Sequence, residues 1–232
     1  RFRVVYDSIN SVGGIAVPAL LKALGVRRVQ GVHSEPTGQF AHNPEPLPQH
    51  LGDLAKEVVD RRADVGFAVD PDVDRLSIVC EDGSFFGEEY TLVSVADFVL
   101  SQRKGNTVSN LSSTSALRDV TVLRGGAYYP SAVGEVNVVQ KMREVRAVVG
   151  GEGNGGVILP DLHYGRDALV GIAIFLTQLA KSGKTVRDLR RQYPDYYLSK
   201  NRIELSPGVQ PDTLLEQVKQ LFSQERLNTE DG

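Results

Sequence analysis

Six residues, Asp70 to Arg75, constrain this chain more than any other stretch, because they place three carboxylates at alternate positions between two apolar runs. The runs at 65–69 and 76–80 are short and apolar, which predicts two buried strands with the acidic hexapeptide as the loop between them. Three like charges in one loop repel one another unless a cation joins them. Carboxylate oxygens are ligands that suit Mg²⁺. The alternative is a plain acidic turn, because aspartate favours turns.

Strand and helix patterns alternate from the first residues onward. In the first part of the chain the pattern predicts strands at 3–6, 27–32, 65–69 and 76–80, and helices at 15–24, 49–62 and 88–102. This alternation is typical of a parallel sheet with crossover helices. It predicts an α/β domain over residues 1–104, with a boundary at residues 103–105.

A second α/β unit follows over residues 105–200. The pattern predicts strands at 107–111, 120–123, 147–149 and 157–159, and helices at 136–145, 167–180 and 185–192. Residues 201–232, with a strand-like run at 203–205 and a helix at 211–222, are too few to form a core and are interpreted as a linker and the beginning of another domain. The predicted fold is therefore α/β, with two tandem three-layer domains that have mixed, mostly parallel sheets, plus a short partial C-terminal piece.

The charge and cysteine content exclude several function classes. The formal net charge is −3, so the chain lacks the basic character of a protein that binds nucleic acid or an anionic membrane. Its apolar runs are all shorter than a membrane span. The single cysteine, Cys80, cannot form a disulfide within one chain, which favours a reducing compartment and predicts a cytoplasmic protein.

Two other loop types also place aspartates at alternate positions. An EF-hand calcium loop fits Asp70, Asp72, Asp74 and Glu81, but Arg75 stands where that loop requires glycine, and the flanking runs predict strands instead of helices. A haloacid-dehalogenase-type phosphatase has a nucleophilic aspartate in a D-x-D-x-[TV] loop, and Asp74 replaces its small residue. The metal-loop interpretation is therefore preferred over both.

Four segments resemble, in the same order, motifs of the α-D-phosphohexomutase family, which includes phosphoglucomutases, phosphomannomutases and phosphoglucosamine mutases. They are the NPEP loop at 43–46, the DxDxDR metal loop at 70–75, the T-x-V-G-like segment at 131–135 and the sugar-specificity loop at 151–156, with Gly-Arg-Asp downstream at 165–167. The resemblance covers nearly the whole chain. It implies the second and third of the family's four domains, followed by the start of the fourth.

By the same resemblance, the chain is expected to be cut from a longer protein, whose other domains are its partners. The first domain of the family carries a phosphorylated serine in a Ser-His-Asn-Pro context. The chain has Ala41 before His42-Asn43-Pro44, and this stretch matches the second domain, so it is not the nucleophile loop. Arg226-Leu227-Asn228-Thr229-Glu230 partly resembles the family's substrate-phosphate site and is interpreted as an entry strand.

The resemblance assigns roles to the acidic loop. Asp70, Asp72 and Asp74 each give an oxygen to Mg²⁺, and the fourth ligand is the phosphoserine of the first domain. Arg75 is the catalytic residue of this chain and holds a phosphoryl oxygen. Weak Mg²⁺ binding, or none, is expected without the serine domain.

The resemblance also implies a sugar-binding set, namely Glu152, Asn154, Gly134 and Arg166. Glu152 and Asn154 contact the 3- and 4-hydroxyls of a hexose, because a carboxylate accepts hydroxyl protons and an amide both donates and accepts. Many bacterial members have serine where Asn154 stands, and this departure leaves the choice of sugar open.

The implied function is transfer of a phosphoryl group between the 1 and 6 positions of a hexose phosphate, through a phosphoserine and a bisphosphate intermediate. The Glu-Gly-Asn-Gly-Gly loop, with Gly-Arg-Asp-Ala-Leu after it, is most similar to phosphoglucosamine mutases. Phosphoglucomutase/phosphomannomutase is the alternative within the family. An alternative of another class is a fragment that binds a sugar phosphate or a metal and, lacking the serine, catalyses nothing.

Overall fold

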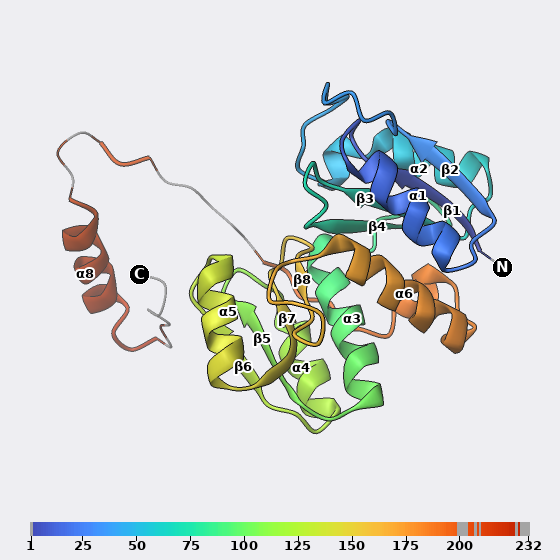
Figure 1. The fold of residues 1–232 in the computed structure, drawn as a ribbon. Helices are drawn as coiled ribbons and strands as arrows, with labels where there is room; N and C mark the ends of the chain where they lie inside the picture. The colour runs from blue at the N-terminus through green and yellow to red at the C-terminus, as the bar shows by residue number, and fades with distance from the viewer. Residues whose placement is uncertain (1, 199–203, 207, 209, 226, 228–232) are drawn as a thin grey trace.

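The computed structural model describes residues 2–198, 204–206, 208, 210–225 and 227, and contains two four-stranded sheets (Figure 1). The first sheet has the order β2-β1-β3-β4. Its strands are β1 (Arg3–Asp7), β2 (Arg28–Val32), β3 (Val65–Val69) and β4 (Leu76–Cys80). Strands β1, β2 and β3 are parallel, and β4 is antiparallel to β3.

The second sheet repeats this arrangement, with the order β6-β5-β7-β8. Its strands are β5 (Asn106–Asn110), β6 (Tyr128–Ser131), β7 (Ala147–Gly151) and β8 (Val157–Ile158). Only the β7–β8 pair is antiparallel. The mixed, mostly parallel sheets of the prediction are confirmed. In both sheets the antiparallel pair lies at the same edge, so the acidic loop at 70–75 and the glycine-rich loop at 152–156 occupy equivalent positions.

Helices cover both faces of each sheet. They are α1 (Gly13–Ala23), α2 (Gly52–Asp60), α3 (Glu88–Gln102), α4 (Ala116–Leu123), α5 (Glu135–Glu144), α6 (Ala168–Ser182), α7 (Val186–Arg190) and α8 (Pro211–Leu221), with a 3₁₀ turn, η1 (Pro48–His50), before α2. Leucine and valine side chains of α2 pack against one face of the first sheet. Helix α5 packs against the face of the second sheet that points away from the first sheet. Helices α1, α3, α4 and α6 share the large apolar cluster between the sheets.

Phe175 of α6 illustrates how the two sheets share this cluster. Its ring lies edge-on to Phe67 of β3, with centroids 6.2 Å apart, and to Phe86, with centroids 5.3 Å apart. The same cluster includes Val149 of β7. Because side chains of both sheets meet in one core, their relative placement is set by close packing. The domain boundary at 103–105 stays a prediction.

The strand predicted at 120–123 is wrong. These residues form the end of helix α4, whose buried residues Ala116, Leu117, Val120 and Thr121 follow helical spacing. Val122 and Leu123 are 63% and 82% exposed, so the apolar run does not mark a buried strand. The strand of this region is instead β6, which begins at Tyr128. It contains Pro130, a residue that a strand tolerates at the edge of a sheet.

The C-terminal predictions are tested only in part. The helix predicted at 211–222 is confirmed as α8. The strand-like run at 203–205 begins outside the described residues, and Glu204 and Leu205 are not in a strand. The segment 226–230 also lies outside the described residues, except for Leu227. Among the helices that the structure describes, none combines the length and apolar character required to cross a membrane.

Candidate functional site

The acidic loop is fixed by its backbone, although its tip is strained. Val73 has φ 62°, a left-handed conformation that is unusual for a β-branched residue. Its amide donates to the carbonyl of Asp70 (3.1 Å), and its carbonyl accepts from the amide of Ala168 at the start of α6 (3.0 Å). The loop that follows β3 is therefore fastened to the helix that follows β8.

Asp70 is the buried anchor of this loop, with 0% of its surface exposed. Its Oδ1 accepts from the amides of Asp74 and Arg75, both at 3.0 Å. Its Oδ2 accepts from Nε of Arg75 at 2.6 Å. Burial opposes ionisation, but the hydrogen bonds from Asp74 and Arg75 outweigh it and hold the pKa of Asp70 below its usual range.

The other two aspartates differ in exposure. Asp72 is exposed and Asp74 is half-buried. Burial and the neighbouring carboxylate of Asp70 raise the pKa of Asp74 to about 7, against the opposing charge of Arg166. Crowded carboxylates of this kind stabilise a bound cation, because the cation relieves their repulsion.

The glycine-rich loop presents one buried carboxylate. Glu152 is 4% exposed. Its Oε1 accepts from the Nδ2 of Asn110 at 2.8 Å, and its Oε2 accepts from Nη1 of Arg166 at 2.5 Å. Asn110 is held in turn by Ser113, whose hydroxyl donates to the Asn110 Oδ1 at 2.6 Å. The carboxylate is therefore held in one orientation at the end of β5 and β7.

Arg166 joins the two loops. Its Nη1 binds Glu152 of the glycine-rich loop, and its Nη2 binds the Oδ2 of Asp74 in the acidic loop. Glu135, at the start of α5, accepts from the Arg166 amide at 3.1 Å and lies 3.5 Å from its Nε. The surrounding carboxylates outweigh the effect of burial and raise the pKa of Arg166. A single guanidinium thus connects three segments that are far apart in the sequence.

The backbones of the two loops also meet directly. The amide of Leu76 donates to the carbonyl of Gly155 at 3.1 Å, and Arg75 and Gly156 form an isolated antiparallel bridge. Gly155 has φ 90°, and a Cβ atom there would overlap the carbonyl of Leu76. The closeness of the loops therefore requires glycine at this position.

Gly155→Ala is expected to lower the free energy of unfolding by at least about 2 kcal/mol, because the steric overlap adds to the cost of a positive φ. Gly25→Ala is the matched control, since Gly25 has φ 78° with nothing within 4 Å of the added carbon. It should cost only about 1 kcal/mol. Urea unfolding of both variants measures the difference, and equal losses would show that the contact between the loops is not tight.

The remaining residues of the predicted set lie around this junction. Asn154 turns its Oδ1 back to accept from the amide of Gly156 (3.2 Å). Gly134 has φ 112° and precedes α5, next to Glu135. The Nη1 of Arg75 lies 3.9 Å from Glu45 of the proline-rich loop, which is the segment 33–47 between β2 and η1. The roles of these residues in binding stay predictions.

Sequence reasoning missed the residues that support the site. Asn110, Ser113 and Glu135 position Glu152 and Arg166. A signal for the first two was present, because Asn110 lies near the end of the predicted strand at 107–111 and Ser113 shortly after it. The carboxyl ends of parallel strands meet at one edge of a sheet.

The acidic loop fits a divalent cation on its own geometry. One oxygen from each of Asp70, Asp72 and Asp74 lies within 4.8 Å of the other two. The Oδ1 of Asp74 is buried and has no hydrogen-bond partner among the described residues, so an acceptor is left for a cation. The donor set is all oxygen, which suits a hard ion such as Mg²⁺.

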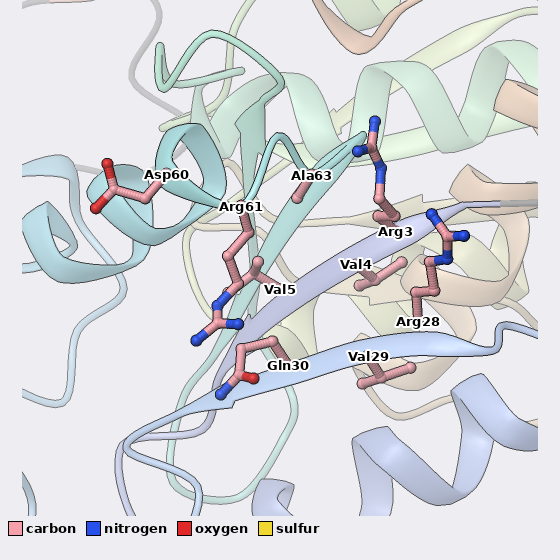
Figure 2. Close-up of a pocket in the computed structure, with 9 residues that line it drawn as sticks. All are labelled: Arg3, Val4, Val5, Arg28, Val29, Gln30, Asp60, Arg61 and Ala63. Atoms are coloured by element: carbon pink, nitrogen blue, oxygen red, sulfur yellow. The ribbon is translucent and has the colours of Figure 1, made fainter.

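A separate groove lies at the opposite end of the first sheet. This groove has a volume of about 440 Å³. Figure 2 shows the side chains of Arg3, Arg28 and Arg61, which line it. Arg3 and Arg28 are the first residues of their strands, whereas the acidic loop follows the last residue of β3. The groove is therefore not part of the candidate site.

The chain matches two models of known protein families. Residues 1–83 match "Phosphoglucomutase/phosphomannomutase, alpha/beta/alpha domain II", and residues 87–197 match "Phosphoglucomutase/phosphomannomutase, alpha/beta/alpha domain III". Together the two matches cover most of the chain and both loops of the candidate site.

Similar proteins have the same family names. A phosphoglucomutase/phosphomannomutase of Thermococcus kodakarensis is 36% identical over 86% of this chain and 44% of its own length. A probable phosphoglucosamine mutase of Pyrococcus abyssi is 32% identical over the whole chain and 52% of its own length. The chain therefore spans about half the length of these relatives.

A solved structure shows the same fold. It is the Aspergillus fumigatus N-acetylphosphoglucosamine mutase in complex with GlcNAc-6P and magnesium, with a TM-score of 0.63, 15% identity, and coverage of 97% of this chain and 54% of that chain. At this identity the likeness extends to the fold alone. Taken together with the two matched domain models, the junction of acidic and glycine-rich loops places the chain in the α-D-phosphohexomutase family.

Proposed function

We propose that this chain is the metal- and sugar-binding part of a Mg²⁺-dependent phosphohexomutase, which moves a phosphoryl group between the 1 and 6 positions of a hexose phosphate. The observation that carries the proposal is the contact of one guanidinium, Arg166, with both Asp74 and Glu152. This contact brings a cluster of metal-binding carboxylates next to a buried group that can accept sugar hydroxyls.

In this proposal Asp70, Asp72 and Asp74 hold Mg²⁺, the ion that also accompanies the sugar phosphate in the fungal structure. When bound, the ion would supply positive charge that offsets the negative charge of a transferring phosphoryl group. The serine that carries this group belongs to a domain outside the present sequence. Arg75, fixed by Asp70, presents its guanidinium to a phosphoryl oxygen.

Glu152 orients the sugar in the proposed site. Both of its oxygens are already hydrogen-bonded, one to Asn110 and one to Arg166, but each oxygen keeps a second lone pair for a hydroxyl proton. Asn154, Gly134 and Arg166 complete the proposed sugar-binding set. Because the carboxylate is held from both sides, it binds the sugar without first being ordered.

Glucosamine phosphate is the proposed substrate, because relatives named probable phosphoglucosamine mutase match the chain over its full length. Glucose and mannose phosphates are the alternative, supported by the 36% identical Thermococcus phosphoglucomutase/phosphomannomutase. The chain supplies no nucleophilic serine in a matching motif, so by itself it is proposed to bind and not to turn over substrate.

Interconversion of the 1- and 6-phosphates of glucosamine, glucose and mannose by the full-length parent protein, assayed with Mg²⁺, tests this function. We expect turnover that is fastest for glucosamine phosphate and absent for the isolated 232-residue chain. Lack of turnover on all three sugars would contradict the mutase assignment. Measurable turnover by the isolated chain would contradict the need for an external serine.

A further inference from the structure

A second cluster of potential metal ligands lies outside the proposed Mg²⁺ site. Asp7 ends β1, His33 directly follows β2, and His42 belongs to the proline-rich loop. One oxygen of Asp7 and one ring nitrogen of each histidine lie within 4.8 Å of one another. Asp7 is only 2% exposed, and its Oδ2 faces both rings, with His33 Nδ1 at 3.0 Å and His42 Nε2 at 3.2 Å.

The hydrogen bond on the far side of His42 determines which nitrogen faces Asp7 without a proton. Nδ1 of His42 lies 2.8 Å from the carbonyl oxygen of Asn43, which can only accept, so Nδ1 carries the proton. In the neutral ring the lone pair of Nε2 then points at a carboxylate oxygen. Two acceptors that face each other at 3.2 Å need a positive charge between them, which either a proton on Nε2 or a metal ion supplies.

The outer nitrogen of His33 has a more distant partner than that of His42. The nitrogen that faces away from Asp7, Nε2, lies 3.6 Å from the carboxylate of Asp53. The backbone of His33 is held by the amide of Asn10 and the hydroxyl of Ser8, which both donate to its carbonyl oxygen at 2.6 and 3.1 Å. His42 therefore has a hydrogen-bonded oxygen acceptor behind its ring, whereas the carboxylate behind His33 lies beyond hydrogen-bond distance. The arrangement at His42 is typical of histidines that bind a metal.

The three ligand atoms suit a borderline ion better than Mg²⁺. Two imidazoles and one carboxylate form a donor set that favours Zn²⁺ or a similar transition metal. Tetrahedral Zn²⁺ with bonds of about 2.0–2.2 Å places its ligand atoms about 3.3 Å apart. The 3.0 and 3.2 Å separations around Asp7 approach this value.

We propose that Asp7, His33 and His42 bind one divalent transition-metal ion, Zn²⁺ in the first instance, with the fourth position open to solvent. The ion would join the ends of β1 and β2 to the proline-rich loop. Glu45 of that loop lies 3.9 Å from Arg75, so the bound ion also steadies a neighbour of the acidic loop. This inference does not depend on the proposed mutase activity.

The test is titration of the metal-stripped 232-residue chain with Zn²⁺ in a calorimeter and with Co²⁺ in a spectrophotometer. We expect one Zn²⁺ per chain with Kd at or below about 1 μM, and visible Co²⁺ bands of a four-coordinate site. His33→Gln and His42→Gln should each raise the Kd at least about 10-fold. Circular dichroism without metal checks that each variant folds.

Two variants serve as controls. His50→Gln removes a histidine outside the cluster, and Asp72→Asn alters the proposed Mg²⁺ site; both should leave the Zn²⁺ affinity unchanged. Absence of Zn²⁺ binding by the wild-type chain would overturn the proposal, as would binding that survives both cluster variants. Loss of Zn²⁺ binding in Asp72→Asn alone would place the ion on the acidic loop instead. If only one cluster variant folds, that variant and the Co²⁺ bands decide the question.

Discussion

Asp72→Asn is expected to reduce kcat of the proposed mutase in the full-length parent at least about 1,000-fold at saturating substrate, because a neutral amide is a poor ligand for Mg²⁺. At this position an effect of the substitution on catalysis can be distinguished from an effect on folding. Asp72 is exposed, and the described part of the chain provides no hydrogen bond to its side chain. The free energy of unfolding of this chain should therefore change by less than about 0.5 kcal/mol.

Asp188→Asn is the matched control for this prediction. Asp188 is an exposed aspartate on α7, and its carboxylate lies 3.5 Å from Arg191 on the same helical segment. Its substitution should leave kcat near the wild-type value. Steady-state assays over a range of Mg²⁺ concentrations measure both variants. Full activity of Asp72→Asn would remove this residue from the metal site.

Arg166→Met is expected to lower the free energy of unfolding at pH 8 by about 3–5 kcal/mol, because it leaves buried charge without a partner. The guanidinium is the partner of Asp74 and Glu152, whose side chains are 17% and 6% exposed. Methionine keeps much of the apolar stem of arginine, so the loss of stability comes mainly from removal of the guanidinium charge. The same variant should also impair sugar binding in the full-length parent.

The loss in Arg166→Met should depend on pH. The pKa of Asp74 in the folded chain, about 7, is above its ordinary value of 3.8, so its contribution to stability is favourable at low pH and is lost as the pH rises through 7. Without Arg166 the same carboxylate loses an opposing charge, which raises its pKa further. The destabilisation should therefore be smaller at pH 5 than at pH 8, in urea unfolding with EDTA.

Arg103→Met is the control for a surface ion pair. Arg103 binds Asp161 at 2.7 Å, but these side chains are 42% and 61% exposed. Such a pair contributes at most about 1 kcal/mol. Similar losses for Arg103→Met and Arg166→Met would contradict the view that Arg166 compensates buried carboxylates.

The order of elements was largely predictable, because strands buried on both faces read as apolar runs and the helices show clear periodicity. Helix α3 begins and ends where the pattern predicts, and β3 and β4 enclose the acidic loop. The region before β6 was not predictable in the same way. Its apolar run at 120–123 belongs to a helix end, whereas the true strand is at a sheet edge and contains a proline.

The candidate site was predictable only in its motifs. The acidic and glycine-rich loops are visible in the sequence, and the resemblance named Arg166. The contact of Arg166 with both loops was not predictable, because it depends on how two sheets pack against each other. The same holds for Asp7, His33 and His42, which come together only when the ends of β1 and β2 and the proline-rich loop meet.

The shared core between the sheets limits how such proteins can diversify. Phe175, which follows the glycine-rich loop in sequence, packs its ring against Phe67 of β3 and against Phe86, which follows β4. A recombination event that exchanged one sheet for that of a distant relative would bring a mismatched side chain into this core. Exchange of one sheet alone is therefore expected to destabilise the chain until the shared core is repacked.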